Sequence, residues 1–546
     1  MKISYLKDNI HLTIYSYWSW WFEASNKQDE ISRAILTVSI VVFMFLWYKW
    51  SFSSSKTSDQ LPLPPGPRGL PILGYLPFLQ PDLHKHYTQL AHRYGPIFKI
   101  WLGTKLYVIV SSSELAKTVV RDQDQVFANR DPPIAALAIT YGGINIVWSN
   151  NGPYWRKMRK VLVHEVLSNA NLDACRGYRR DEVSKSIKDL YTKIGTKVNI
   201  NEIAFFTELN VITSMLWGST YVEGEKTGNL GAEYRVMVFK IIELLGAPNV
   251  SDFFPILARF DLQGVDRVMK REWAKIDLIL DQIIEERIRS NASRSKEMAD
   301  KERSKDFLQT LLDLKEQNDA AKSFNFTQMK ALLMCILGLN LLSAYQDIAI
   351  GGTDTTATMV EWVMAEILDH PEVMKKVQDE LSQVVGMDNT LEESHLPKLH
   401  YLDAVIKETF RLHPTLPLLT PRCPNQSCTV GGYTVPKGAI VFLNVWAIHR
   451  DPEKWENSSE FFPERFLNYN EDNTMWFFPF GSGRRMCPGI PLAEKMLVYM
   501  LASLLHAFKW SVPLDEELDL FEKFGIVMKK RKPLILVPSL RYHHDY

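Results

Sequence analysis

A cysteine near the C-terminus lies in the segment with the clearest chemical signal. Residues 480–489 read F-G-S-G-R-R-M-C-P-G, so Cys487 stands between Gly483 and Gly489. A cysteine binds metals in its thiolate form, which must be shielded from solvent and oxidants. The glycines permit tight backbone turns, and backbone N–H groups can then temper the charge on the sulfur. This spacing predicts a protected metal-binding thiolate; the alternative is a buried free cysteine in an ordinary glycine-rich turn.

A second segment combines an acid with an alcohol. Residues 351–356 read G-G-T-D-T-T. Gly351 and Gly352 relax a helix at this point, and the freed backbone groups together with Thr355 can hold oxygen and water. Asp354 and Thr355 form an acid–alcohol pair suited to proton delivery. The alternative is a helix kink whose polar residues face solvent.

Other charged residues have spacings that suit a positioning role. Glu408 and Arg411 are three residues apart, so on a helix they share one face and can pair. Arg465 lies in the segment F-F-P-E-R-F, and Trp155 and Arg159 bound the segment W-R-K-M-R. Alone, the spacing of Glu408 and Arg411 is weak evidence, and the segment around Trp155 also fits a generic amphipathic helix.

Together these segments resemble the cytochrome P450 superfamily. The chain matches W-x-x-x-R, [AG]-G-x-[DE]-T-[ST], E-x-x-R, F-x-P-E-R-F and F-x-x-G-x-R-x-C-x-G in family order, from about residue 61 to residue 538. On average composition, the last pattern arises by chance in roughly one chain in ten thousand. The resemblance implies a mainly α-helical P450 fold with small β-sheets, and haem b as the cofactor.

The same resemblance assigns roles to individual residues. Cys487 is expected to be the axial ligand of the haem iron, where a thiolate pushes electron density onto the metal and favours O–O cleavage. Asp354 and Thr355 are expected to be catalytic, as the pair that delivers protons to bound oxygen. The expected structural triad, which locks the fold around the haem, is Glu408, Arg411 and Arg465. The other expected cofactor-binding residues are Arg485, which would pair with a haem propionate, Trp155, Arg159, Arg422, Gly483 and Phe480.

Composition favours one large soluble body. Of 546 residues, 46% are hydrophobic and 23% charged, close to globular averages. Lys plus Arg and Asp plus Glu both number 63, so no overall positive field attracts nucleic acid, and no nucleic-acid partner is expected. The five cysteines are too few and scattered for a disulfide framework. Cys423 and Cys428 lack a second pair that would complete a metal site.

The N-terminal region predicts a membrane anchor. Residues 34–48 are apolar and uncharged, and a helix of this length spans about 22 Å at about 1.5 Å per residue. That is short for a bilayer, but the flanking Arg33 and Lys49 can snorkel; the alternative is a buried core helix. The predicted parts of the chain are an N-terminal extension (1–30), a transmembrane signal anchor (31–50), a Ser/Pro-rich linker (51–67) and a haem-thiolate monooxygenase domain (68–546).

The anchor, the proline-rich linker and the motifs together resemble plant microsomal P450s. This implies a single-pass protein of the endoplasmic reticulum membrane, whose catalytic domain faces the cytosol and receives electrons from NADPH–cytochrome P450 reductase. Residues 129–133, 141–143 and 522–527 are most similar to plant sesquiterpene hydroxylases of the cadinene type. The expected reaction is hydroxylation of a small apolar sesquiterpenoid with O2. Flavonoid or phenolic hydroxylation is the alternative, because pocket loops such as 132–146 and 416–422 diverge fastest in function.

One segment departs from the family pattern. Residues 330–334 (K-A-L-L-M) run almost directly into the D-x-x-x-G-G stretch in the family, whereas here the 12 residues 335–346 intervene. They would add about 18 Å of helix and rotate upstream residues by about 120°, or bulge out as a loop. A retained intron fragment and a catalytically impaired haem-binding isoform are therefore alternatives. An oxygen-independent isomerase or dehydratase is disfavoured by Thr355, which such members often lack.

Overall fold

The computed structural model describes residues 27–52, 61–218, 248–293, 306–316, 324–337, 353–467, 476–525 and 527–541. Several predicted features lie outside the described residues: the N-terminal extension up to residue 26, linker residues 53–60, insertion residues 338–346, Gly351 and Gly352.

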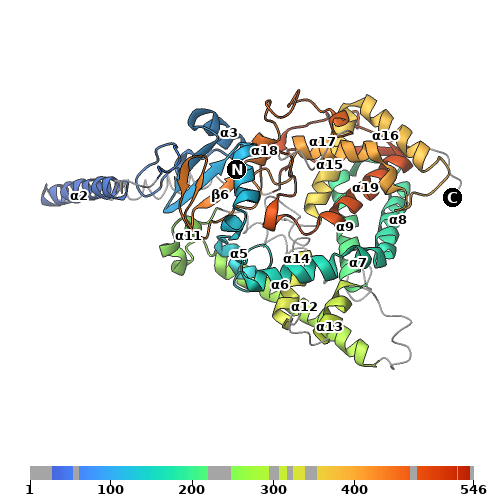
Figure 1. The fold of residues 1–546 in the computed structure, drawn as a ribbon, viewed down its shortest axis with the longest axis horizontal. Coiled ribbons are helices and arrows are strands. Elements are labelled where there is room, and N and C mark those ends of the chain that lie inside the picture. The colour runs from blue at the N-terminus through green and yellow to red at the C-terminus, as the bar shows by residue number, and fades with distance from the viewer. Residues whose placement is uncertain are drawn as a thin grey trace.

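Most of the described chain is helical. Its longer helices are α2 (Lys27–Phe52), α3 (Leu83–Tyr94), α6 (Pro153–Val161), α8 (Arg176–Thr192), α9 (Ile200–Trp217), α12 (Val265–Ser293), α13 (Phe307–Glu316), α14 (Phe326–Leu337), α15 (Asp354–Asp369), α16 (Pro371–Val384), α17 (His400–Leu412) and α19 (Ile490–Ala507). Shorter helices include α5 (Ile134–Ile139), α11 (Val250–Phe253) and α18 (Val445–Ile448). Figure 1 shows α8, α9, α15, α16, α17 and α19 gathered on one side of the molecule, and α3 and β6 on the other. The predicted mainly helical fold is confirmed.

Helix α15 is the centre of the larger core. Residues 356–367 are all buried, so the helix has no solvent-facing stripe over three turns. A helix that is covered on every side belongs to the interior of a large domain. It packs against α9, α16, α17 and α19, and Trp362 is the largest of its fully buried side chains. Residues at the start of α15 are therefore held rigidly by their neighbours.

Small sheets complete the fold, as predicted. β1 (Ile97–Leu102) pairs antiparallel with β2 (Lys105–Val110), and β2 pairs parallel with β6 (Ile440–Leu443). In the second sheet, β10 (Ile535–Leu540) lies between β3 (Val198–Asn199) and β7 (Phe508–Ser511). Two hairpins follow a simpler pattern, β4 (Cys428–Val430) with β5 (Tyr433–Val435) and β8 (Glu522–Lys523) with β9 (Lys529–Lys530).

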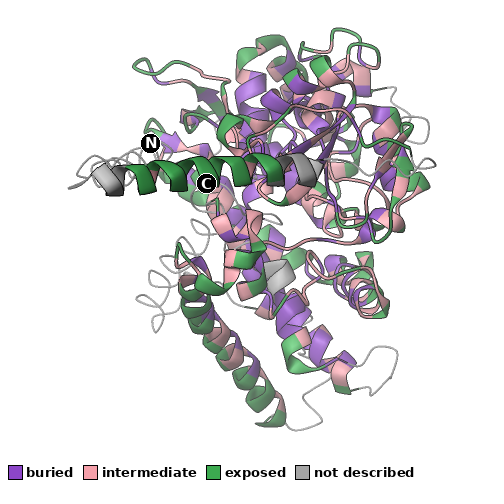
Figure 2. Cartoon of the chain, turned by 90° about the vertical axis from the view of Figure 1, so that its left-hand side faces the viewer, coloured by how far each residue is buried: buried purple, intermediate pink, exposed green. Residues whose placement is uncertain are grey.

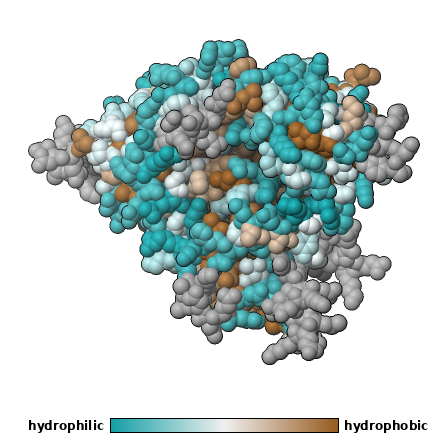
Figure 3. All heavy atoms as spheres, turned by 45° about the vertical axis from the view of Figure 1, so that its right-hand side comes forward, coloured by the Kyte–Doolittle hydropathy of each residue, from teal (hydrophilic) through white to brown (hydrophobic). Residues whose placement is uncertain are grey.

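Helix α2 projects from the body with its apolar side chains exposed. Ile35 and Phe43 are 61% and 69% exposed, and Figure 2 shows the described part of the helix as almost entirely exposed. The face of the body in Figure 3 is, by contrast, mainly hydrophilic with small separate apolar patches. Among described residues, α19 is the one helix long and apolar enough to span a membrane, but most of it is buried in the core. The apolar stretch Ile31–Leu46 within α2 is shorter than that length.

The two sides of the insertion are both packed onto one helix. α14 ends at Leu337, α15 begins at Asp354, and each contacts α9. Lys330, on α14, also forms ion pairs with Asp277 and Asp281 of α12 at 2.7 and 3.0 Å. The helix positions before and after the insertion are thus fixed independently of each other.

Candidate active site

Backbone hydrogen bonds close the segment around Cys487 before α19 begins. The Cys487 N–H donates to the Phe480 carbonyl over 3.0 Å, and the Met486 N–H donates to the Gly483 carbonyl over 3.0 Å. The Gly489 N–H donates to Cys487 Sγ over 3.4 Å. The sulfur therefore lies against a backbone donor, close to the positive end of the α19 dipole.

The two glycines of this segment serve it in different ways. Gly483 has a φ of +69°, and a Cβ there would lie 1.9 Å from the Val120 carbonyl oxygen, so the close approach requires glycine. Gly489 has a φ of −88°. A Cβ at Gly489 would meet Cys487 Sγ at 3.7 Å, which is an ordinary contact. Gly489 thus contributes its N–H group rather than its missing side chain.

The surroundings of Cys487 favour a thiolate only in the presence of a metal. Burial raises the pKa of the Cys487 thiol, while the Gly489 N–H and Arg159 lower it. The net shift is upward, which favours the neutral thiol. Coordination to a metal ion reverses this preference, because a ligating thiol is deprotonated outright.

Arginines that hydrogen-bond only to backbone carbonyls among the described residues form a basic cluster beside this loop. Burial lowers the pKa of Arg485 to about 9, with contributions from Arg422 and Arg159. Burial also lowers the pKa of Arg422 to about 10. The pKa of Arg130 is lowered well below its usual range by burial and then by Arg422 and Arg485. Arg130, Arg422 and Arg485 therefore lie close enough for their positive charges to destabilise one another. They are called the arginine cluster below.

The hydrogen bonds of the arginine cluster leave donors unused. Arg485 donates only to backbone carbonyls, at 2.6 Å for Ala128 and 3.0 Å for Ile146. Arg422 Nη2 donates to the Ser482 carbonyl over 2.7 Å, but its buried Nη1 has no partner. The buried Nε of Arg130 has none either. No carboxylate of the described residues hydrogen-bonds to these three guanidinium groups.

These observations test whether haem b fits the site. Buried charges with unused donors are costly unless an anion accepts from them, and guanidinium groups suit carboxylates. Haem b carries two propionate carboxylates beside an iron that accepts a thiolate. The arginine cluster and Cys487 Sγ together match that donor set, so the residues present fit the cofactor.

Sequence reasoning missed Arg130 as a member of this cluster. Residues 129–133 were noticed only for their similarity to one group of hydroxylases. In the structure Arg130 donates to the Thr420 and Pro421 carbonyls at 2.7 and 2.5 Å, close to Arg422. A cation three residues after the buried Phe127 is the available signal, since a charge so close to a core residue needs a partner.

Helix α6 turns its Trp and Arg toward residues 480–489, called the thiolate loop below. Trp155 Nε1 donates to the Ile146 carbonyl over 2.9 Å, and its ring centre lies 4.3 Å from the Arg485 guanidinium. Arg159 donates to the Met486 carbonyl over 2.6 Å. The structure thus brings Trp155 and Arg159 together with Arg485. Phe480 lies at the other end of the loop, its ring centre 5.1 Å from that of Phe410.

Glu408, Arg411 and Arg465 meet in the core beneath this loop. Arg411 Nε and Nη2 each bond a different oxygen of Glu408 at 2.8 Å. Arg465 Nε bonds Glu408 Oε1 at 3.0 Å. Phe462 N–H adds a fourth bond to the same carboxylate at 2.9 Å. The three charges are therefore joined by direct bonds, at the place where α17 meets the segment 461–466.

Asp354 lies in the first turn of α15, with Thr355 partly buried after it. The Asp354 side chain is 3% exposed, and its Oδ1 accepts from Lys529 Nζ over 2.8 Å. Burial raises the pKa of Asp354 to about 6, although Lys529 acts in the opposite direction. An acid of this strength can gain and lose a proton near neutral pH. Helix α15 packs against α19, which leads directly from the thiolate loop.

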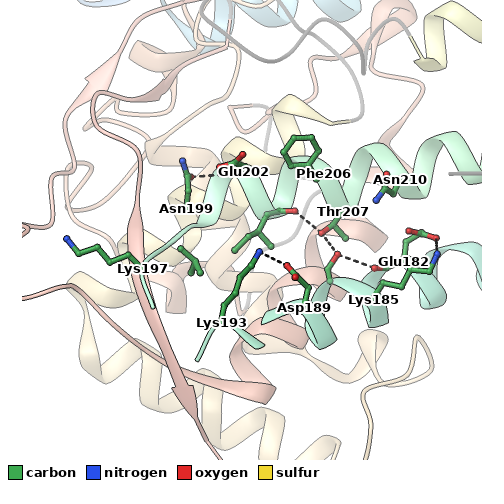
Figure 4. A pocket seen from close by; sticks show the side chains of 13 residues that line it. Glu182, Lys185, Asp189, Lys193, Lys197, Asn199, Glu202, Phe206, Thr207 and Asn210 are labelled. Carbon is green, nitrogen blue, oxygen red and sulfur yellow. Dashed lines mark hydrogen bonds and ion pairs between the residues drawn. The ribbon is translucent and has the colours of Figure 1, made fainter. Parts of the chain in front are cut away.

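A groove elsewhere on the molecule does not belong to this site. It measures ≈ 660 Å³ and is lined by residues of α8, β3 and α9 with the chain between them. Figure 4 shows its charged side chains, including Lys193 and Asp189, which form an ion pair at 2.6 Å. None of the predicted site residues lines it. Its lysines are all engaged in ion pairs, Lys185 with Glu182, Lys193 with Asp189, and Lys197 with Asp515 outside the groove.

Comparison with known proteins gives consistent results. The cytochrome P450 family model matches residues 64–537. A flavonoid 3'-monooxygenase from Crocosmia x crocosmiiflora is 37% identical, over 92% of this chain and 99% of its own length. A geraniol 8-hydroxylase from Catharanthus roseus is 35% identical over 92% of this chain and 99% of its own. Carnosic acid synthase from Salvia pomifera is 36% identical, over 87% of this chain and 93% of its own.

Solved structures resemble the fold. A zebra fish cytochrome P450 with abiraterone superposes with a TM-score of 0.68 at 26% identity, covering 85% of this chain and 100% of that chain. The same comparison for a zebra fish cytochrome P450 with progesterone gives a TM-score of 0.69 at 25% identity, over 84% of this chain.

Proposed function

This chain belongs to the cytochrome P450 family and is a haem b monooxygenase, and from that premise we propose that it hydroxylates a small apolar plant metabolite, a sesquiterpenoid. The observation that carries the assignment of the site is that the sulfur of Cys487 accepts the Gly489 N–H, and that Cys487 follows Arg485 of the arginine cluster by two residues. No other described segment combines a shielded cysteine with unused cationic donors.

The geometry supports the following proposed roles. Cys487 would hold the iron through its thiolate, and the arginine cluster would hold the propionates. Haem b, when bound, supplies the activation of O2 for insertion into a C–H bond. Asp354 and Thr355 would hold and pass the protons that oxygen activation consumes. Burial of Asp354 in the first turn of α15 excludes bulk water from that carboxyl.

An apolar substrate is supported by the residues of α5. This helix lies in the loop region 132–146 and consists only of Ile, Ala and Leu. It packs against α12 and offers no polar side chain that would orient a phenolic hydroxyl. The relative that acts on geraniol, a terpenoid alcohol, fits this reading. Residues 129–133 and 141–143 add their similarity to sesquiterpene hydroxylases of the cadinene type.

Flavonoid hydroxylation is the second candidate. It is favoured by the 37% identity to a flavonoid 3'-monooxygenase across nearly the whole of both chains. Loops around the substrate decide between the two classes, and identity at this level does not fix them.

We also propose that the electrons come from NADPH–cytochrome P450 reductase at the endoplasmic reticulum, with the body facing the cytosol. Helix α2 supplies the apolar anchor segment. On α6, Arg156 and Lys160 are exposed and Lys157 is partly buried, which makes a basic surface for an acidic partner.

The first experiment is the carbon-monoxide difference spectrum of the dithionite-reduced, membrane-expressed protein. We expect a Soret band at the thiolate position, and its loss in Cys487→Ser. Wild-type protein without that band would contradict the proposed ligand. Protein with the band is then supplied with reductase, NADPH and panels of sesquiterpenes and flavonoids. Products from flavonoids alone would replace the sesquiterpenoid proposal, and turnover without reductase would contradict the proposed electron donor.

A further inference from the structure

The partner of Asp354 is a lysine from a distant part of the chain. Lys529 belongs to β9, in the hairpin β8–β9 near the C-terminus, 175 residues after Asp354. We propose that Lys529 is a positioning residue for oxygen activation: its ammonium group orients the Asp354 carboxyl and joins it to the solvent-facing edge of the hairpin. This inference rests on the proposed role of Asp354.

Two hydrogen bonds of Met528, next to Lys529, fix the hairpin, one to the chain after α17 and one to the Trp362 side chain of α15. The Met528 N–H donates to the Thr415 carbonyl over 2.9 Å, and the Met528 carbonyl accepts from Trp362 Nε1 over 3.1 Å. Both Met528 and Trp362 are fully buried. Because the preceding residue cannot move, the Lys529 side chain starts from a defined point beside the first turn of α15.

The two ends of this ion pair differ in their contact with solvent. The Lys529 side chain is 21% exposed, whereas that of Asp354 is 3% exposed. A carboxyl that gives up a proton in the interior must recover it from water. The partly exposed Lys529 side chain therefore links the Asp354 carboxyl to the surface of the hairpin.

Other charged groups near α15 have partners of their own. Glu361, two turns along the helix, accepts from the Leu534 N–H at 2.8 Å and from Asn201 of α9 at 3.1 Å. Lys530 lies 5.1 Å above the Trp362 ring and bonds the Asp519 carbonyl. Lys529 is the charged group that acts on Asp354, and its removal should therefore raise the pKa of that carboxyl.

The reaction itself provides a readout that needs no substrate. With NADPH as reductant and O2 as oxidant, two electrons and two protons give hydrogen peroxide, whereas four electrons and four protons give two molecules of water. Proton delivery to the bound oxygen decides between these outcomes. A protonated Asp354 favours water, so the peroxide released per NADPH should rise as pH increases through the pKa of this carboxyl, which burial places at about 6.

The test follows peroxide per NADPH against pH for the full-length protein with reductase. We expect a midpoint near pH 6 in the wild type. In Lys529→Met no cation opposes the effect of burial on the pKa of Asp354. The midpoint should therefore move upward by about one pH unit. Lys529→Arg keeps the charge and should keep the midpoint. Asp354→Asn should abolish it, and Lys529→Met should then have no further effect.

Lys532→Met is the matched control, because it removes an exposed lysine from the same segment. Its midpoint should equal that of the wild type. The thiolate Soret band is measured first in every variant, and Lys529→Gln replaces Lys529→Met if the latter lacks the band. A wild-type midpoint after removal of Lys529 would overturn this inference alone. A wild type without the band, or a midpoint that survives in Asp354→Asn, would overturn the proposed function of the site as well.

Discussion

Arg411 has no contact with solvent, yet it carries a full charge. It donates to both oxygens of Glu408 and to the carbonyls of His449, Ser458 and Glu460. These bonds tie α17 to residues 449 and 458–460, which precede the thiolate loop in the chain. A buried pair contributes little net stability, but removing one partner leaves the other charge uncompensated.

We therefore expect Arg411→Ala to lower the free energy of unfolding by about 3–5 kcal/mol and to block haem incorporation. The measurement is the amount of thiolate Soret band per unit of expressed protein. Lys407→Ala is the control, since Lys407 pairs with Asp403 near the surface of the same helix, where ion pairs are worth about 0–1 kcal/mol. A normal band in Arg411→Ala would contradict the structural role given to this residue.

Among single residues, those in local patterns could be predicted from the sequence, and those defined by distant partners could not. Glu408 and Arg411 share one helical turn, so their pairing follows from spacing alone. The roles of Arg130 and Lys529 depend on their contacts with Arg422 and Asp354, which lie far away in sequence. Nothing in a linear pattern marks such a contact, because it depends on how the hairpin β8–β9 and the loop before α5 pack.

At the scale of elements, a polar contact holds the segment after α5 against two helices. Tyr141 has a φ of +50°, an unusual value for a bulky residue, and its hydroxyl donates to Asp277 of α12 over 2.5 Å. Asp277 also pairs with Lys330 of α14 at 2.7 Å. The edge-to-face contact between the rings of Tyr141 and Trp273, whose centres are 5.4 Å apart, adds to these contacts. The contacts of Tyr141 with Asp277 and Trp273 are together called the latch below. The latch therefore fixes the loop region proposed to border the substrate.

Loss of the Tyr141 hydroxyl should loosen this loop without affecting the thiolate loop. In Tyr141→Phe we expect a loss of about 1–3 kcal/mol of local stability, because the Asp277 carboxylate loses a hydrogen bond. The expected kinetic result is a higher KM for the hydroxylated substrate with an unchanged Soret band. Tyr154→Phe is the comparison, since Tyr154 bonds only the nearby Ile144 carbonyl. Equal KM values for Tyr141→Phe and the wild type would show that the latch does not position the loop.

Helices and strands were largely predictable from the sequence, whereas the exact bounds of α2 and the structure of the insertion were not. The helical face that carries Glu408 and the apolar segment in α2 follow from periodicity and composition. The sequence predicted an anchor at residues 31–50, and the helix extends over Lys27–Phe52, because charged and polar flanking residues also suit a helix. The fate of the insertion could not be derived from spacing, since helix and loop satisfy the same count of residues, and residues 338–346 lie outside the described chain.

At the scale of the whole molecule, the proposed membrane attachment makes a prediction about the surface of the body. An apolar surface lies on the side of the body from which α2 projects. Figure 1 shows α11 on that side, and some residues of this surface follow α11 directly in the chain. Its residues, called the apolar rim, are Leu70, Ile72, Leu73, Phe78, Ile256, Phe260 and Leu262, each more than 40% exposed. The loop between β1 and β2 joins its two halves, since Gly103 N–H bonds the Leu73 carbonyl at 3.1 Å and Thr104 N–H bonds the Phe253 carbonyl at 3.0 Å.

Exposed apolar side chains clustered beside the proposed anchor favour contact with lipid, because burying each large side chain stabilises by about 1.5–3 kcal/mol. We expect a chain that begins at residue 61, and so lacks α2, to sediment with phospholipid vesicles while keeping its Soret band. Substituting Ile256, Phe260 and Leu262 with Asn should release it from the vesicles. Leu514→Asn alters a leucine that is even more exposed but lies outside the rim, and it should leave sedimentation unchanged. If the triple variant sediments like its parent, the apolar rim does not touch the membrane, and α2 alone sets the position of the body.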